Sequence, residues 1–218
     1  FLNMLKNKHF VFDLDDTLYK EIEFVKSAYN YIVNYMLIRY KIDPIELANN
    51  AILKNLNFFD LIHSNYNIDF DLKTYLDLYR FHMPNIKLSN DAKSLLEVFD
   101  KKMIAYSIVT DGRSISQRNK LNSLGLLDKI SLIVISQETG YCKPDSYNFE
   151  LIQKKHPENS FVYVGDNTDK DFIAPNKLGW DTVCLLDNGQ NIHKQKFNLN
   201  KDKTPKFVVQ NLSEILEL

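Results

Sequence analysis

The chain has 218 residues, which is enough for one large domain or for one domain that carries a substantial insertion. It contains 27 basic and 28 acidic residues, a net charge of -1, and this balance argues against partners such as nucleic acid or an anionic membrane surface. No apolar run approaches the ~20 residues of a membrane span, and the first residues lack the pattern of a signal peptide. Because Cys142 and Cys184 make no disulfide framework, the sequence predicts free thiols and a cytoplasmic protein.

The first predicted element is a short buried strand at residues 10–12, where strong strand formers follow one another. Asp13, Leu14 and Asp15 come directly after it, and alternation along a strand predicts that Asp13 and Asp15 point the same way. Two carboxylates ~4 Å apart repel by about 4 kcal/mol at an effective dielectric of about 20. Such a pair indicates a bound cation or a shared proton, with a solvated acidic turn as the alternative reading.

Residues 18–85 show helical spacing and no strand signal. The predicted helices are residues 21–39, a second helix that starts at Asp43-Pro44, and residues 69–81 before Pro84. Residues 55–67 fit either a short helix or a loop. The many tyrosines of this block are expected to pack in its core rather than to take part in chemistry.

From Ser89 onward, strand and helix patterns alternate, which predicts a parallel sheet covered by helices on both faces. The expected strands are residues 103–109, 132–135, 161–164, 182–186 and 207–209. The expected helices are residues 89–99, 114–124, 144–156 and 174–179, and a last helix capped by Ser213. The polar residues 187–205 are expected to form a surface excursion. The predicted fold class is therefore α/β, a doubly wound parallel sheet with an inserted helical block.

Polar residues follow the predicted strands at the ends where they would share one edge of the sheet. They are Asp13 and Asp15, then Thr110, Asp111 and Gly112, then Lys143, and finally Asp166 and Asp171. Ligands of open parallel sheets bind at the carboxyl ends of the strands. Each residue alone would be an ordinary turn or cap residue, but together they predict one functional site.

These motifs resemble the four motifs of the haloacid dehalogenase superfamily of phosphohydrolases, in the family's order. They are Asp13-Leu14-Asp15-Asp16-Thr17, Thr110-Asp111-Gly112, Lys143-Pro144, and Gly165-Asp166 with Asp171. The resemblance covers residues 8–17 and 89–186, and Ala174-Pro175 departs from a frequent glycine-alanine pair outside the chemistry. It implies subfamily I with a helical cap of the first type (C1). The implied domains are a Rossmann-like catalytic core at residues 1–17 and 86–218 and a cap at residues 18–85.

The resemblance also implies a role for each motif residue. Asp13 would attack phosphorus and form an aspartyl-phosphate intermediate. Asp15 would protonate the leaving alcohol and later activate water, and it is expected to carry a proton at first because of Asp13 and the substrate phosphate. Thr110 and the backbone amides of Asp111 and Gly112 would hold phosphoryl oxygens, while Lys143 would offset their negative charge.

The implied cofactor is Mg²⁺, bound by Asp13, by the carbonyl of Asp15 and by Asp166, with Asp171 in support. Hard oxygen ligands without a histidine or thiolate cluster suit this ion. Dehalogenases of the superfamily need no metal and lack an acid two residues after the nucleophile. Asp15 and Asp166 therefore favour phosphoryl transfer over dehalogenation.

The predicted function is a Mg²⁺-dependent phosphatase that hydrolyses a small phosphorylated metabolite, a sugar phosphate or a nucleotide. A phosphomutase of the β-phosphoglucomutase type uses the same residues and remains an alternative. A receiver-like signalling module is disfavoured by the helical insertion, and an inactive phosphate-binding scaffold by the intact motifs.

The expectations outside the motifs concern side chains near the hinge and the phosphate-binding turn. Lys20 and Arg113 are candidate contacts for an anionic substrate, with a solvated surface position as the alternative for each. Gln117 and Lys120, on the helix that follows Arg113, are expected to be exposed. The sequence does not determine the oligomeric state.

Overall fold

The structure is a computed structural model that describes residues 7–69, 71–197 and 200–217. Residues 1–6 of the expected core lie outside the described residues. No helix in the described part of the chain is long and apolar enough to span a membrane.

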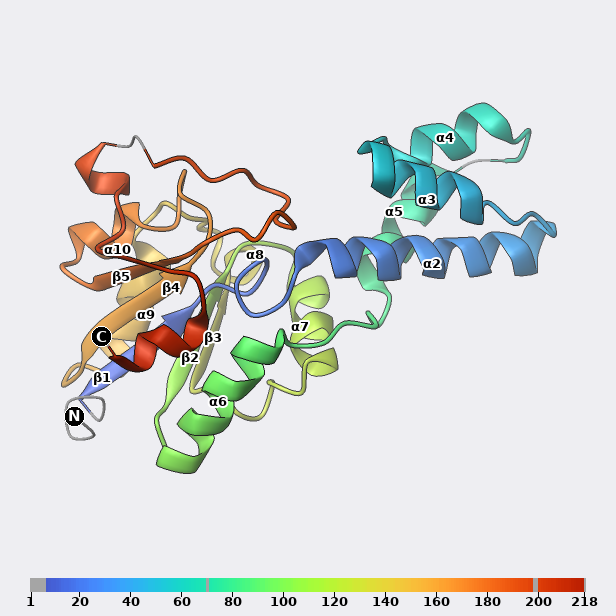
Figure 1. The fold of residues 1–218 in the computed structure, drawn as a ribbon. Coiled ribbons are helices and arrows are strands. Elements are labelled where there is room, and N and C mark those ends of the chain that lie inside the picture. The colour runs from blue at the N-terminus through green and yellow to red at the C-terminus, as the bar shows by residue number, and fades with distance from the viewer. Residues whose placement is uncertain (1–6, 70, 198–199, 218) are drawn as a thin grey trace.

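Within these ranges, six parallel strands form one sheet in the order β3-β2-β1-β4-β5-β6 (Figure 1). The strands are β1 (Lys8–Phe12), β2 (Tyr106–Thr110), β3 (Leu132–Ile135), β4 (Ser160–Gly165), β5 (Asp181–Leu185) and β6 (Phe207–Val209). Phe12 of β1 pairs with Ile108 of β2 on one side and with Val164 of β4 on the other. The strand order reverses between β1 and β4, the position where open α/β sheets bind ligands. The predicted doubly wound parallel sheet is confirmed.

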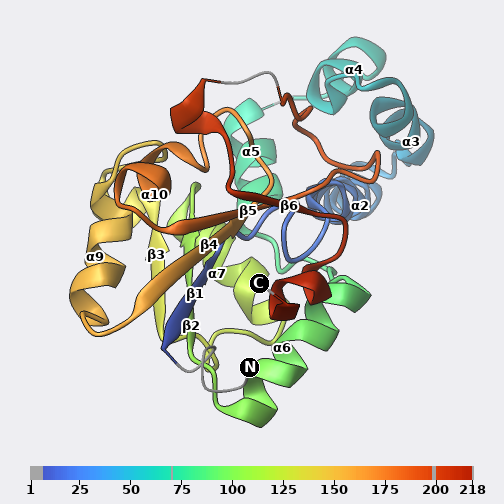
Figure 2. The ribbon, with the colours of Figure 1, turned by 60° about the vertical axis from the view of Figure 1, so that its left-hand side comes forward.

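Helices cover both faces of this sheet, as Figure 2 shows. One face carries α6 (Asn90–Lys102), α7 (Ser114–Ser123) and the 3₁₀ helix η2 (Leu212–Glu217), and the other carries α9 (Tyr147–Lys155) and α10 (Ile173–Lys177). Successive side chains of β1 point to opposite faces of the sheet, so Phe10 and Phe12 pack in the core on the first face and Val11 packs in the core on the second. Two short elements were not expected from the sequence, α8 (Ser136–Thr139) and the 3₁₀ helix η1 (Lys201–Lys203).

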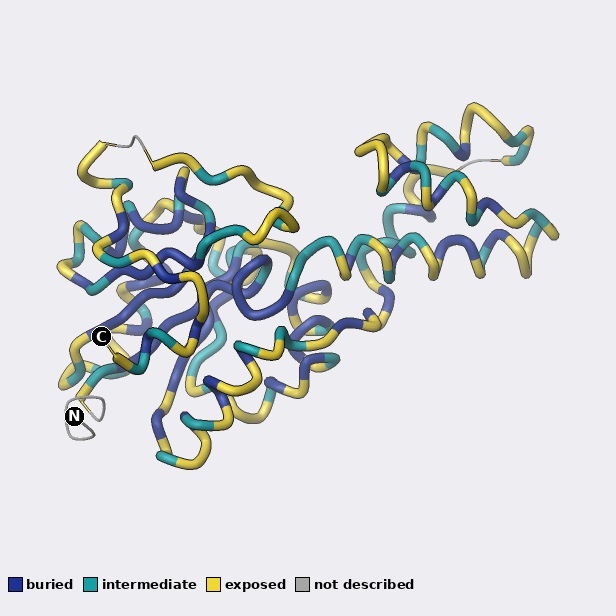
Figure 3. Tube along the Cα trace, viewed as in Figure 1, coloured by how far each residue is buried: buried dark blue, intermediate teal, exposed yellow. Residues whose placement is uncertain are grey.

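The helical insertion between β1 and α6 extends away from the sheet (Figure 1). It comprises α2 (Glu21–Tyr40), α3 (Ile45–Lys54), α4 (Phe58–Asn65) and α5 (Leu72–Phe81). Its core is separate from the sheet core and includes Ile32, Met36, Phe58, Ile62 and Tyr75. The segment that the sequence left open, residues 55–67, contains α4. Figure 3 shows buried stripes along these helices and the deepest burial along the strands.

Two segments differ from the sequence predictions. The strand expected from residue 103 begins at Tyr106, because α6 continues to Lys102 and Met103 caps it in the left-handed region, at φ 55°. Ser213 does not cap the last helix; the Asp91 carboxylate instead accepts the amide N–H groups of Leu212 and Ser213. The expected surface excursion is confirmed for residues 187–196, which form no helix or strand and are mostly exposed, and this segment also turns back over the carboxyl edge of the sheet.

Candidate active site

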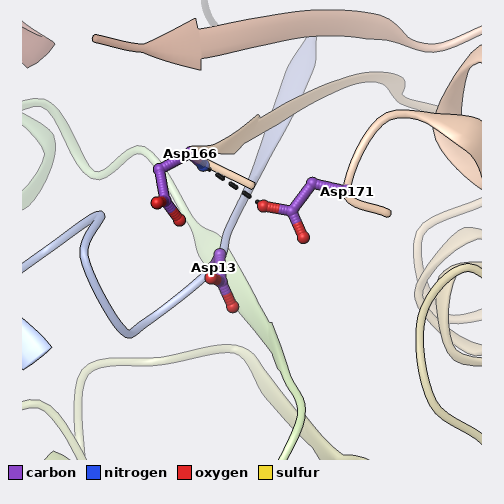
Figure 4. A group of neighbouring side chains, drawn as sticks. All are labelled: Asp13, Asp166 and Asp171. Atoms are coloured by element: carbon purple, nitrogen blue, oxygen red, sulfur yellow. Dashed lines mark hydrogen bonds between the residues drawn. The ribbon is translucent and has the colours of Figure 1, made fainter. Parts of the chain in front are cut away.

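Three carboxylates meet at the carboxyl edge of the sheet (Figure 4). Asp13 follows β1, Asp166 follows β4, and Asp171 lies in the turn before α10. One oxygen from each lies within 4.8 Å of the others, and all three residues are buried. The backbone supports this convergence, since the Asp13 amide donates to the Val164 carbonyl at 2.8 Å and so continues the β1–β4 pairing.

Lys143 is the cation of this group. Its Nζ lies 2.8 Å from Asp13 Oδ1 and 2.8 Å from Asp171 Oδ1, and it donates to the Tyr163 hydroxyl at 3.0 Å. Burial alone would lower the pKa of Lys143, but Asp13 and Asp171 raise it well above its usual value. Lys143 is therefore a fixed positive charge.

One lysine does not balance three carboxylates, and the pKa values of Asp13 and Asp166 are raised. Burial, opposed by Lys143 and reinforced by Asp171, raises the pKa of Asp13 to about 7. Burial, together with Asp171 and Asp13, raises the pKa of Asp166 to about 9. A further cation beside these groups would favour their ionised forms.

The backbone near Asp171 is shaped around its carboxylate. Asp171 Oδ2 accepts the amides of Asp166 at 3.2 Å and of Asn167 at 2.9 Å, while its other oxygen pairs with Lys143. A Cβ atom at Gly165 would lie 2.5 Å from Asp171 Oδ2, so only glycine fits there. Both oxygens of Asp171 are thus engaged by the protein.

The end of β2 and the turn after it lie beside this group. Thr110 and Asp111 line a pocket together with Asp13, Lys143 and Asp166. Thr110 Oγ1 accepts a hydrogen bond from Gln117 Nε2 at 2.5 Å. Asp111 is held by the Lys143 amide at 3.1 Å and by Lys170 Nζ at 2.7 Å. The Gly112 amide donates to Ser136 Oγ at 2.9 Å, and its expected contact with a phosphoryl oxygen stays a prediction.

Asp15 also lines the pocket, and its carboxylate is held from the side of α7. Lys120 Nζ lies 2.7 Å from Asp15 Oδ1, Gln117 Nε2 donates to Oδ2 at 3.0 Å, and the Tyr19 hydroxyl donates to Oδ1. Burial alone would raise the pKa of Asp15, but Lys120 and these hydrogen bonds leave it below its usual value. Without substrate, Asp15 is therefore held as a carboxylate, and its protonation beside a substrate phosphate stays a prediction.

The expectation that Gln117 and Lys120 are exposed is also wrong. They are 2% and 4% exposed, and they lie on the inward face of α7 with Leu121. A signal was present in the sequence, because positions 117, 120, 121 and 124 follow the helical spacing of a buried face and the last two are leucines. A buried lysine and glutamine on such a face require polar partners.

The 187–196 segment contributes contacts that the sequence did not predict. Asn191 Nδ2 donates to Asp166 Oδ2 at 2.8 Å, and Gln195 Nε2 donates to the Asp166 carbonyl at 2.8 Å. The Ile192 amide donates to Asp16 Oδ2 at 2.9 Å. No local pattern indicated these contacts, because the segment is polar and aperiodic.

The pocket has a volume of about 140 Å³, and its lining is almost wholly charged or polar. Neither candidate substrate contact lines it: Arg113 is exposed, and Lys20 donates to Asn191 Oδ1 at 2.5 Å. Lys170 and His193 line the pocket instead. Glu21, from the start of α2, lines the remaining side, and burial raises its pKa to about 8.

Comparisons with known proteins agree with this arrangement. The glyceraldehyde 3-phosphate phosphatase of Methanocaldococcus jannaschii is 30% identical, over 97% of this chain and 96% of its own length. The pyrimidine 5'-nucleotidase YjjG of Escherichia coli is 32% identical over 51% of this chain and 48% of its own. The magnesium-bound HAD-hydrolase YfnB of Bacillus subtilis shares the fold, with a TM-score of 0.66 at 19% identity over 97% of this chain and 98% of its own.

The family model described as Haloacid dehalogenase-like hydrolase matches residues 10–185. This match includes the ends of β1, β2 and β4 and the turns after them, which carry Thr110 and the buried carboxylates. The chain belongs to the haloacid dehalogenase-like hydrolase family.

Proposed function

We propose that this protein is a Mg²⁺-dependent phosphatase of a small phosphorylated metabolite. The observation that carries the proposal is the buried group of Asp13, Asp166 and Asp171, two of which contact the pocket-lining cation Lys143. The named phosphatases among the relatives support the same reaction. A triose phosphate is the first substrate to test, because two relatives aligned over nearly the whole chain are named glyceraldehyde 3-phosphate phosphatases.

The donor set fits Mg²⁺. Asp13 and Asp166 present hard carboxylate oxygens, the Asp15 carbonyl is the third expected ligand, and Asp171 is engaged in holding Lys143 and the β4 turn. The bound ion would neutralise the carboxylates and polarise a phosphoryl oxygen. We therefore keep Asp171 as support for the site rather than as a direct ligand.

Four residues of the chain have separate roles in the two steps of the reaction. An Asp13 oxygen forms a bond to phosphorus as the ester P–O bond breaks, and Asp15 gives its proton to the leaving oxygen. The substrate phosphate raises the pKa of Asp15 by adding negative charge nearby, which favours the protonated form. Thr110 and Lys143 bind phosphoryl oxygens. In the second step Asp15 removes a proton from a water molecule whose oxygen bonds to phosphorus as the Asp13–phosphorus bond breaks, which releases inorganic phosphate.

The helical insertion provides the natural cover for this reaction. We propose that residues 18–85 act as a cap on a core of residues 1–17 and 86–218, with Lys170 and His193 facing the substrate beyond its phosphate. The pocket of about 140 Å³ would hold the phosphate of a small substrate, and the cap would exclude water from it.

The proposal is tested with a panel of phosphorylated metabolites that includes glyceraldehyde 3-phosphate, assayed for release of inorganic phosphate. Wild-type protein with Mg²⁺ should release phosphate, and Asp13→Asn should lose at least about 1,000-fold in kcat because the covalent step is removed. Excess chelator should abolish turnover. Wild-type turnover by Asp13→Asn would refute the assigned nucleophile, full activity in chelator would refute the metal requirement, and phosphate exchange without release would identify a mutase.

A further inference from the structure

Lys120 is a buried cation to which the proposed reaction assigns no role. It comes from the middle of α7, and its Nζ lies 2.7 Å from Asp15 Oδ1. The side chain is 5% exposed, against 18% for that of Asp15. A lysine is rarely buried so deeply unless its charge is paired, and the paired group here is the one assigned as the proton donor.

The surroundings fix both members of this pair. Gln117, one turn earlier on α7, donates to the second oxygen of Asp15 at 3.0 Å and to Thr110 at 2.5 Å. The Lys120 ammonium lies 4.4 Å from the centre of the Phe24 ring, which belongs to α2 of the helical insertion. The carboxyl group of Asp15 is therefore oriented by donors to both of its oxygens, and these donors contact the phosphate-binding turn and the cap.

We propose that Lys120, assisted by Gln117, is a positioning residue for Asp15. In the first step the Asp13–phosphorus bond forms, the ester P–O bond breaks, and the proton of Asp15 passes to the leaving oxygen. This leaves a carboxylate on Asp15, beside the Lys120 ammonium, which stabilises the charge as it develops and holds the group at the pocket wall. The inference rests on the proposed phosphatase function and extends it.

A purely structural ion pair and a positioning residue differ in one measurable property. A pair that only stabilises the fold affects every substrate equally. A residue that supports proton donation matters most when the leaving group is basic, because a weakly basic leaving group departs without a proton. Phenyl phosphate and p-nitrophenyl phosphate differ in this property while sharing the same ring.

The test measures kcat/KM of Lys120→Met on these two substrates with Mg²⁺. Methionine keeps the length of the side chain and removes its charge. We expect kcat/KM for phenyl phosphate to fall at least about tenfold more than that for p-nitrophenyl phosphate, because general acid catalysis contributes about 100-fold or more and the variant loses part of it. Lys120→Arg, which restores a cation, should return the ratio of the two values toward that of the wild type.

Lys129→Met is the matched control, because Lys129 also pairs with an aspartate, Asp100 at 2.6 Å, but at an exposed position outside the pocket. Lys129→Met should leave both kcat/KM values unchanged.

An equal fall on both substrates in Lys120→Met with an unchanged thermal midpoint would overturn the inference. If that variant does not fold, Gln117→Met decides in the same way, since it should shift the ratio in the same direction. If the wild type turns over neither aryl phosphate, the same ratio is measured between the most active metabolite of the panel and acetyl phosphate, whose leaving group is weakly basic. Inactivity on all of these substrates would refute the phosphatase proposal itself.

Discussion

Asn191 shows how a single side chain outside the motifs bears on the site. Its amide donates from Nδ2 to Asp166 Oδ2 at 2.8 Å, and its Oδ1 accepts from Lys20 Nζ at 2.5 Å. Lys20 directly precedes α2, so Asn191 joins a proposed metal ligand to the start of the helical insertion. Groups that hydrogen-bond to metal ligands orient them and tune their affinity for the ion.

Asn191→Ala should raise the Mg²⁺ concentration needed for half-maximal activity by about tenfold, because Asp166 loses the donor that orients it. The measurement is a Mg²⁺ titration of phosphate release, with calorimetric titration of Mg²⁺ as a second readout. Asn188→Ala, at an exposed position of the same segment, is the control. An unchanged Mg²⁺ requirement in Asn191→Ala would show that this hydrogen bond does not support metal binding.

At the scale of elements, the C-terminal 3₁₀ helix is attached to α6 by one carboxylate. Asp91, in the first turn of α6, accepts the Ser213 amide at 3.2 Å and the Leu212 amide. Leu212 and Ile215 then pack into the core on that face of the sheet. Asp91 therefore serves as the cap that the sequence pattern had predicted at Ser213.

Asp91→Ala should lower the free energy of unfolding by about 1–3 kcal/mol, because two amide N–H groups at the start of η2 lose their acceptor. The measurement is urea denaturation followed by circular dichroism. Asp100→Ala removes an aspartate of the same helix whose pairing with Lys129 is exposed, so it should cost less than about 1 kcal/mol. Equal effects of the two substitutions would contradict the capping role.

At the scale of the whole molecule, the buried carboxylates Asp13 and Asp166 lower the stability of the fold when they ionise without a bound cation. The pKa values of about 7 for Asp13 and about 9 for Asp166 lie above the unfolded value of 3.8. Both groups therefore retain protons in the folded state that the unfolded chain has already released. Their contribution to stability is fully present below the unfolded pKa and is lost as pH rises through the folded values.

Metal-free protein should consequently lose stability as pH rises toward about 9, whereas Mg²⁺ should restore it by binding the ionised carboxylates. The thermal midpoint should therefore rise more on addition of Mg²⁺ at about pH 8.5 than at about pH 6. Differential scanning calorimetry measures both shifts. Asp166→Asn should reduce the shift, and an equal shift of the wild type at both pH values would contradict this account.

The sequence by itself determined the sheet, the helical insertion and the positions of the motif residues. These follow from local patterns, because apolar periodicity marks each element and the polar residues lie where strands end. The convergence of Asp13 and Asp166 could be predicted, since neighbouring parallel strands deliver their carboxyl ends to the same edge.

Only the tertiary structure decided which groups surround those carboxylates. Lys120 meets Asp15 across 105 positions of the chain, and Ile192 meets Asp16 across 176. Such contacts depend on how α7 and the 187–196 segment pack against the sheet, which no local periodicity encodes. A buried charge is stable only beside a partner, and the packing of the whole chain determines which group that partner is.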